Sequence, residues 1–80
     1  MRVEVRLFAA FADYAPSGKS AVPFEATLNE EATIADLIAQ LAIPQDEVHL
    51  CIVNGRLVHD RTHRLQIDDR VALFPPIGGG

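Results

Sequence analysis

Arg2-Val3-Glu4-Val5-Arg6-Leu7-Phe8 is the stretch that decides the fold, because polar and apolar side chains alternate along it with a period of two. This alternation predicts a β-strand with one buried face, made of Val3, Val5 and Leu7. Residues 22–28 repeat the pattern from Val22 onward, and Pro23 places this second strand at a sheet edge because proline cannot donate a ladder hydrogen bond. The Pro, Ser and Gly of residues 15–20 predict the turn between the strands.

A helix is predicted after this hairpin. Thr33 is placed to cap it, because its hydroxyl can accept a hydrogen bond from the amide of Asp36, whose carboxylate suits the positive helix start. Apolar residues then recur at helical spacing and predict one stripe that covers the sheet: Ile34, Leu37, Ile38 and Leu41. Pro44 stops the run.

Further strands are predicted in the second half of the chain. Residues 48–53 are apolar enough for a central strand, which the pair Asn54-Gly55 ends with a turn, and residues 56–58 predict a short strand after it. Residues 59–64 predict a loop, and residues 70–74 predict the last strand.

This order of elements predicts an α+β fold of the β-grasp (ubiquitin-like) type, with a mixed four- to five-stranded sheet packed on one main helix. Residues 1–75 form the predicted domain, and residues 76–80 form a flexible C-terminal glycine tail. We expect Phe8 in the core and Phe74 with Pro75 on an exposed apolar patch that docks a partner.

Composition excludes several classes of function. A chain of 80 residues has room for one domain, and the single cysteine, Cys51, cannot form an internal disulfide and is predicted to be a small buried hydrophobe. A net charge of −4 argues against a nucleic-acid partner. No apolar run is long enough to span a membrane and no signal peptide is evident, so we expect a cytoplasmic protein. His59 and His63 lie in a predicted loop without further ligands at zinc-like spacing, so we predict no metal site.

The end of the chain, Phe74-Pro75-Pro76-Ile77-Gly78-Gly79-Gly80, carries the candidate chemistry. Two prolines favour an extended form, and glycines without a Cβ can thread a narrow channel and approach a nucleotide phosphate closely. The terminal carboxyl, with a pKa near about 3.5, is an anion at neutral pH and must be activated before a nucleophile attacks it. Attack of this carboxylate on the α-phosphate of ATP would give an acyl-adenylate, from which a sulfur nucleophile such as a persulfide would displace AMP. No phosphate-binding loop is present in the sequence, so the activating machinery must belong to a partner.

The chain resembles the MoaD and ThiS sulfur-carrier family, and most closely the MoaD-like small subunit of molybdopterin synthase. The specific element is the ending from Phe74 to Gly80, which is similar to the Phe-Pro-Pro-hydrophobic-x-Gly-Gly ending of MoaD proteins. Supporting elements are Leu7-Phe8-Ala9 at the end of the first strand, the Val53-Asn54 pair, and the spacing of residues 65–71.

The resemblance implies that Gly80, with Gly79 beside it, is adenylated by a MoeB/ThiF-like adenylyltransferase that uses ATP, and is then converted to a thiocarboxylate. It implies that the tail is inserted into a MoaE-like large subunit, where sulfur passes to a pterin precursor of the molybdenum or tungsten cofactor. The chain would then be a co-substrate with no bound cofactor and no enzyme activity of its own. The predicted partner-binding residues are Phe74, Pro75, Pro76, Ile77 and Gly78.

Several alternatives stay open at this point. Gly78 stands where the family usually has a residue with a side chain, and either Gly79 or Gly80 is the mature terminus, with Gly80 favoured. The sulfur acceptor can instead belong to thiamin synthesis or to another pathway. A ubiquitin-like protein modifier or a docking module has the same fold, and glycine runs also occur as plain linkers.

Overall fold

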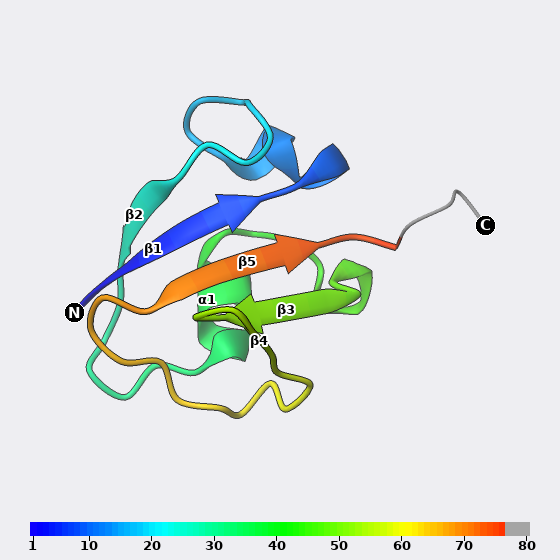
Figure 1. Ribbon diagram of the computed structural model, residues 1–80. Helices are drawn as coiled ribbons and strands as arrows, with labels where there is room; N and C mark the ends of the chain where they lie inside the picture. Colours follow the sequence, from blue (N-terminus) through cyan, green and yellow to red (C-terminus); the bar gives the residue numbers. More distant parts are fainter. Residues whose placement is uncertain (77–80) are drawn as a thin grey trace.

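The structure, a computed structural model, describes residues 1–76. Figure 1 shows the described elements, which are five strands, one α-helix and two short 3₁₀ helices. In chain order they are β1 (Arg2–Leu7), η1 (Ala9–Tyr14), β2 (Phe24–Thr27), α1 (Ile34–Gln40), η2 (Gln45–Glu47), β3 (Leu50–Val53), β4 (Arg56–Leu57) and β5 (Arg70–Phe74).

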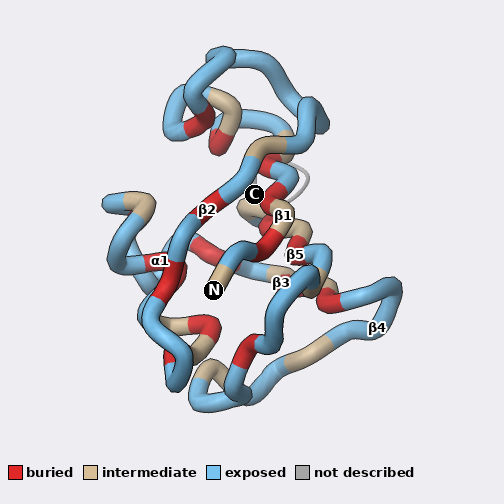
Figure 2. Tube along the Cα trace, turned by 90° about the vertical axis from the view of Figure 1, so that its left-hand side faces the viewer, coloured by how far each residue is buried: buried red, intermediate tan, exposed pale blue. Residues whose placement is uncertain are grey.

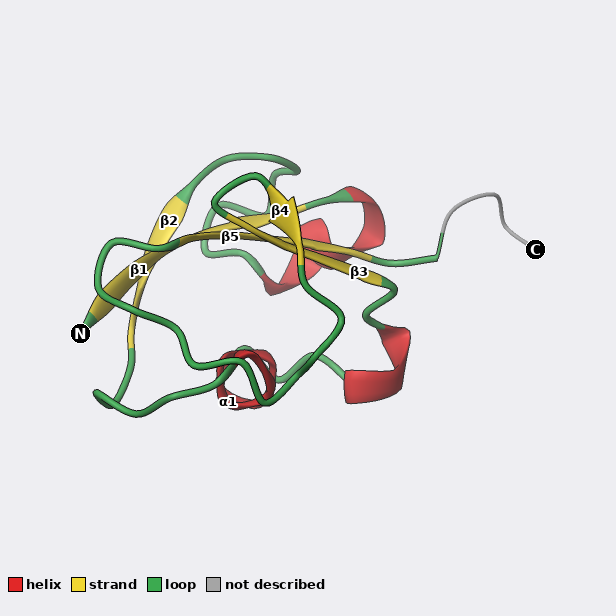
Figure 3. Ribbon diagram, turned by 60° about the horizontal axis from the view of Figure 1, so that its bottom comes forward, coloured by secondary structure: helices red, strands yellow, loops and turns green. Residues whose placement is uncertain are grey.

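The five strands form one mixed sheet in the order β2-β1-β5-β3-β4. The two central strands, β1 and β5, pair in parallel, and the other neighbours pair antiparallel. Helix α1 crosses one face of the sheet, and within residues 1–76 no helix covers the opposite face (Figures 1 and 3). The predicted β-grasp fold is confirmed, and β2 lies at an edge as Pro23 indicated.

The core lies between the sheet and α1. The alternation in β1 buries Val3, Val5 and Leu7 to 1%, 0% and 0% exposure, as predicted. They pack in one cluster with the buried residues of α1, whereas Leu41 of the predicted stripe is only partly buried against it. In Figure 2 buried and exposed residues alternate along the strands, because successive side chains of a strand point to opposite faces.

The predicted cap of α1 is present as a capping box. The amide of Asp36 donates to Thr33 Oγ1 at 3.2 Å, and the amide of Thr33 donates to Asp36 Oδ2 at 2.9 Å. These two bonds satisfy amides at the helix start that have no partner within the helix. The helix ends at Gln40, and Ala42 two residues later has φ +63°.

Two predicted strand starts are wrong, and three predicted strands end one residue early, at Leu7, Thr27 and Leu57. The second strand begins at Phe24 instead of Val22, because Ala21 with φ +66° turns the chain there and leaves Val22 outside the ladder with 39% exposure. The third strand begins at Leu50 instead of residue 48, because η2 occupies the residues before it. The turn at Asn54-Gly55 is confirmed, and both residues have the positive φ that a tight hairpin turn requires.

A core residue that the sequence pattern did not reveal lies in η1. Residues 9–14 have no strand alternation, yet Phe11 in this segment is buried to 2% exposure. A short 3₁₀ helix places a single side chain on the inner side, so no run of periodic apolar residues marks it. Conversely Phe8, predicted in the core, is half-buried.

Candidate functional site

The candidate site is the end of β5, where the chain leaves the sheet. Strand β5 runs away from the end at which the N-terminus lies, so the tail leaves at the opposite end (Figure 1). The amide of Phe8 donates to the carbonyl of Leu73 at 3.2 Å, and the amide of His49 donates to the carbonyl of Phe74 at 2.8 Å. Hydrogen bonds from both neighbouring strands therefore hold β5 up to its last residue.

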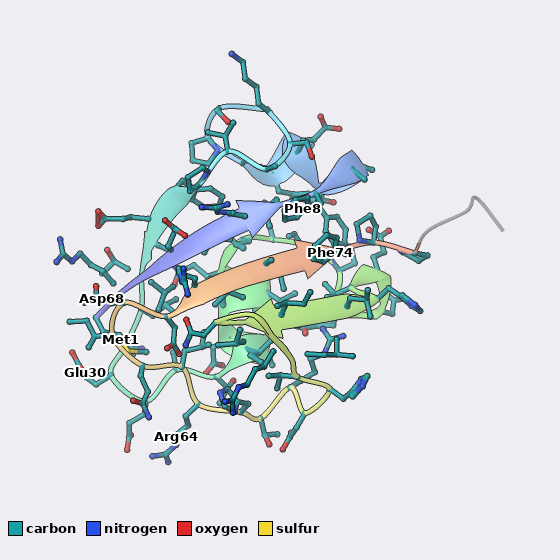
Figure 4. The ribbon with its side chains drawn as sticks, viewed as in Figure 1. Met1, Phe8, Glu30, Arg64, Asp68 and Phe74 are labelled. Atoms are coloured by element: carbon teal, nitrogen blue, oxygen red, sulfur yellow. The ribbon has the colours of Figure 1, made fainter. Side chains whose placement is uncertain are left out.

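Phe8 and Phe74 form a stacked pair at this exit. Their ring centroids are 4.3 Å apart and their planes are 14° from parallel (Figure 4). Phe8 is outside the core because it follows Leu7 in the alternation and so lies on the face that α1 does not cover. The docking prediction for Phe74 is compatible with its half-buried position on that open face.

The stacked pair is one end of an apolar surface on the open face, which we call the exit patch. The strand register brings its members together, since Leu50 pairs with Phe74, Ile52 with Ala72, and Ile52 with Leu57. The exit patch consists of Phe8, Leu50, Ile52, Leu57, Ala72 and Phe74. None of these side chains is buried, and Leu57 is 50% exposed. The exit patch is therefore an apolar surface that α1 leaves uncovered, and it is a candidate surface for contact with another protein.

Sequence reasoning missed most of the exit patch. Residues 48–53 were predicted as an apolar central strand, without a distinction between its two faces. The prediction of a single helix could have revealed it, because one helix covers only one face of a sheet. One of the two alternating pairs in this strand, Cys51 with Val53 or Leu50 with Ile52, therefore had to remain uncovered.

A groove lies beside the start of the tail. Pro75 is half-buried and Pro76 exposed, and both line this groove together with η1 and η2 residues: Ala10, Phe11, Asp13, Tyr14 and Glu47. The ring of Tyr14 packs edge-on against Phe11, with centroids 6.2 Å apart. The tail thus starts between the exit patch and this groove.

The remaining tail residues Ile77, Gly78, Gly79 and Gly80 lie outside the described residues. The roles assigned to them, and the division between a domain and a tail, stay predictions.

The other half of the open face is polar. Arg2 lies 3.8 Å from Glu25, and Arg6 Nε lies 3.6 Å from Glu4 Oε2. Glu4 pairs across the strands with Arg70, yet within residues 1–76 no ion pair joins the two side chains. Three of these residues, Glu4, Arg6 and Arg70, border a shallow hollow that reaches the exit patch. The hollow is also lined by Ile52, Gly55, Val71 and Ala72.

The thiol of Cys51 is not a nucleophile in the folded protein. It is 1% exposed, and burial raises the pKa of Cys51 to about 11, although the charge of Arg61 acts in the opposite direction. Because the thiolate is the reactive form, this cysteine stays protonated and inert at neutral pH. The prediction that it behaves as a buried hydrophobe is confirmed.

His59 and His63 lie in the predicted loop, outside helices and strands. Within residues 1–76 no group of three or more His, Cys, Asp or Glu side chains is placed to hold a metal ion. In the same part of the chain, no helix has the length and apolar character that a membrane crossing requires.

The chain matches one family model and several solved structures. The model of the ThiS family matches residues 5–80. No curated protein sequence matches the chain.

Two of the similar solved structures carry the name of a molybdopterin-converting factor, and each is more than a quarter identical to this chain. A putative molybdopterin converting factor, subunit 1, from Pyrococcus furiosus is 27% identical with a TM-score of 0.71, and the match covers 96% of this chain and 99% of that one. The protein–protein complex of subunits 1 and 2 of the molybdopterin-converting factor from Helicobacter pylori contains a chain that is 26% identical with a TM-score of 0.62, covered fully on both sides.

Small archaeal modifier protein 1 of H. volcanii has a similar structure, with a TM-score of 0.72, and the match covers 95% of this chain and 98% of that one. Its 22% identity supports a common fold only.

Proposed function

Because the chain belongs to the ThiS family, we propose that it is a sulfur carrier whose Gly80 carboxyl is adenylated, converted to a thiocarboxylate and used to donate sulfur in molybdopterin synthesis. The coarser assignment, a ubiquitin-like protein of the carrier or modifier type, follows from the family match and the fold. The carrier would be a co-substrate of other proteins, cytoplasmic, with no cofactor of its own.

The observation that carries the proposal is the position of the exit. Strand β5 ends at Phe74 and Pro75 follows it, beside the exit patch and at the end of the sheet away from the N-terminus (Figure 1). A partner that binds the exit patch is therefore placed to receive the residues that follow. The family match extends over these residues, to Gly80.

The chemistry requires two steps on the terminal carboxyl. An oxygen of the carboxylate attacks the α-phosphate of ATP, so that pyrophosphate leaves and an acyl-adenylate forms. The terminal sulfur of a persulfide then attacks the acyl carbon and AMP leaves, which produces an acyl disulfide. A thiol then attacks the sulfur atom that belongs to the donor and is not bonded to the acyl carbon. The sulfur–sulfur bond breaks, the thiocarboxylate is released, and a new disulfide joins the donor to the thiol.

The carrier contributes to these steps by holding its terminal carboxyl where the partner can reach it. Cys51 is buried and protonated, so the persulfide and the thiol come from partners. The proposed partners are a MoeB/ThiF-like adenylyltransferase and a MoaE-like large subunit. The molybdopterin assignment is supported by the likeness to subunit 1 proteins of molybdopterin-converting factors, one of which is solved in complex with its subunit 2.

Intact mass spectrometry tests the proposal. The full chain is incubated with ATP, a MoeB/ThiF-like enzyme and a sulfur donor, and its mass is expected to rise by the difference between sulfur and oxygen. A mixture without ATP is the control. An unchanged mass together with lysine adducts would contradict sulfur transfer and identify a protein modifier instead. Transfer of the sulfur to a thiazole precursor rather than a pterin would move the assignment to thiamin synthesis.

A further inference from the structure

We propose that Arg70, at the border of the exit patch, receives a carboxylate from the adenylyltransferase that binds the tail. This inference rests on the proposed function and names a specificity contact for the first partner of the carrier. The tail extends into the partner and the exit patch makes apolar contact with it. Arg70 would add selectivity for a partner surface that carries a negative charge.

Arg70 is the unpaired cation of the open face. Its cross-strand neighbour Glu4 lies 3.6 Å from Arg6, and Glu25 lies 3.8 Å from Arg2. Within residues 1–76 the guanidinium of Arg70 has neither an ion pair nor a hydrogen bond, and Asp68, which lines a neighbouring hollow with it, forms no ion pair with it either. A guanidinium can still form the two-pronged contact that carboxylates favour.

The backbone of Arg70 is held firmly on both sides of its Cα. Its amide donates to Asn54 Oδ1 at 2.9 Å, and its carbonyl accepts from the amide of Asn54 at 2.8 Å. Asn54 also donates through Nδ2 to Asp69 Oδ1 at 2.8 Å. The Cα of Arg70 therefore has a fixed position beside the hollow, and only the side chain has to be ordered when a partner binds.

The hollow around Arg70 continues the exit patch. Ile52 and Ala72 belong to both, so a protein that covers the exit patch also covers the hollow. Water excluded from this border strengthens a charge-assisted bond to Arg70.

The adenylyltransferase is the partner to which this contact is assigned, because a carrier of this type needs activation whichever acceptor later takes the sulfur. A partner with a positive charge opposite this hollow would be repelled by Arg6 and Arg70, which line it.

The test compares Arg70→Gln with Arg56→Gln in the full chain. Arg56 is a matched control, because it is an exposed arginine of the same sheet on the opposite face. It pairs across the strands with Val53, which is buried against the core, and paired residues share a face. The probe is the purified MoeB/ThiF-like adenylyltransferase encoded in the same genome, and binding is followed by surface plasmon resonance at low and high salt. Thermal melting verifies that each variant is folded.

Arg70→Gln is expected to raise the Kd about tenfold, mainly through faster dissociation, and to weaken the salt dependence of binding. Arg70→Lys, which keeps the charge, should recover part of the affinity, and Arg56→Gln should bind like the wild type. Equal affinity of Arg70→Gln and the wild type would overturn this inference while the thiocarboxylate assay still supports the carrier function. A wild-type chain that neither binds nor becomes thiocarboxylated would overturn both.

Discussion

The ring of Phe8 stacks on the ring of Phe74 at a centroid distance of 4.3 Å, and this contact joins the end of β1 to the residue at which the tail leaves β5. The alternation of buried residues in β1 and β5 puts the pair on the open face of the sheet, opposite the face that α1 covers in Figure 3. It therefore contributes both to the stability of the central strand pair and to the surface beside the tail.

Replacing Phe8 by alanine is expected to lower the free energy of unfolding by about 1–2 kcal/mol, from the lost stack and the apolar area of a half-buried ring. Urea denaturation measures this change. Phe8→Leu keeps most of the apolar area and should be less destabilised. Under conditions in which Phe8→Ala is folded, its rate of thiocarboxylate formation should also fall. A normal rate would show that the stacked pair serves stability alone.

Removal of Gly79 and Gly80 is expected to abolish thiocarboxylate formation without loss of stability. The described contacts that hold β5 end at Phe74 and Pro75, and none of them depends on these glycines. Thermal melting and intact mass spectrometry, run on the same sample, measure the two properties. Thiocarboxylate formed on the shortened chain would contradict the assignment of the carboxyl of Gly80.

Thr33→Ala is expected to destabilise the domain by about 1 kcal/mol, because it removes the hydroxyl that accepts from the amide of Asp36. Thr33→Ser keeps a hydroxyl at this position and should retain most of the stability. Urea denaturation of both variants measures the change in the free energy of unfolding. Equal losses in the two variants would mean that the methyl group of Thr33, and not the cap, carries the effect.

Ala42→Gly is expected to stabilise the domain by about 0.5–1 kcal/mol. Ala42 follows the C-cap of α1 with φ +63°, a left-handed conformation that is costly for a residue with a Cβ and natural for glycine. The same change at Ala39, an exposed position within α1, is the control and should destabilise the helix. A loss of stability in Ala42→Gly would contradict the strain argument.

The buried thiol of Cys51 should make stability fall at alkaline pH. Burial raises the pKa of Cys51 to about 11 in the folded protein, whereas a thiol in an unfolded chain ionises near about pH 8.5. Between these values the unfolded state has lost the proton that the folded state retains. The contribution of this thiol is therefore complete below about pH 8.5 and decreases as the pH rises toward 11.

Urea denaturation of the wild type and Cys51→Ala as a function of pH checks this effect. The stability difference between the two proteins is expected to shrink as the pH rises through this window. A difference that stays constant with pH would show that Cys51 ionises alike in the folded and unfolded chains.

Local signals were sufficient for much of the fold. The alternation in β1, the Thr33 cap, the Asn54-Gly55 turn and the last strand were all predicted, because each depends on residues within a few positions of one another. Phe8 was misplaced although the alternation puts it opposite Leu7, because only the fold shows that α1 leaves this face of the sheet uncovered.

The amino-acid sequence by itself determined that five strands and one α-helix form and which family the ending resembles, since strand alternation, caps, tight turns and the Phe-Pro-Pro segment are properties of neighbouring residues. Only the tertiary structure decided that β1 lies beside β5 and that α1 covers one face alone. These two facts bring Phe8 onto Phe74, gather the exit patch and leave Arg70 without an ion pair in the described chain. The reason is physical: such contacts join residues far apart in the sequence, and their positions follow from how the whole sheet packs on its helix.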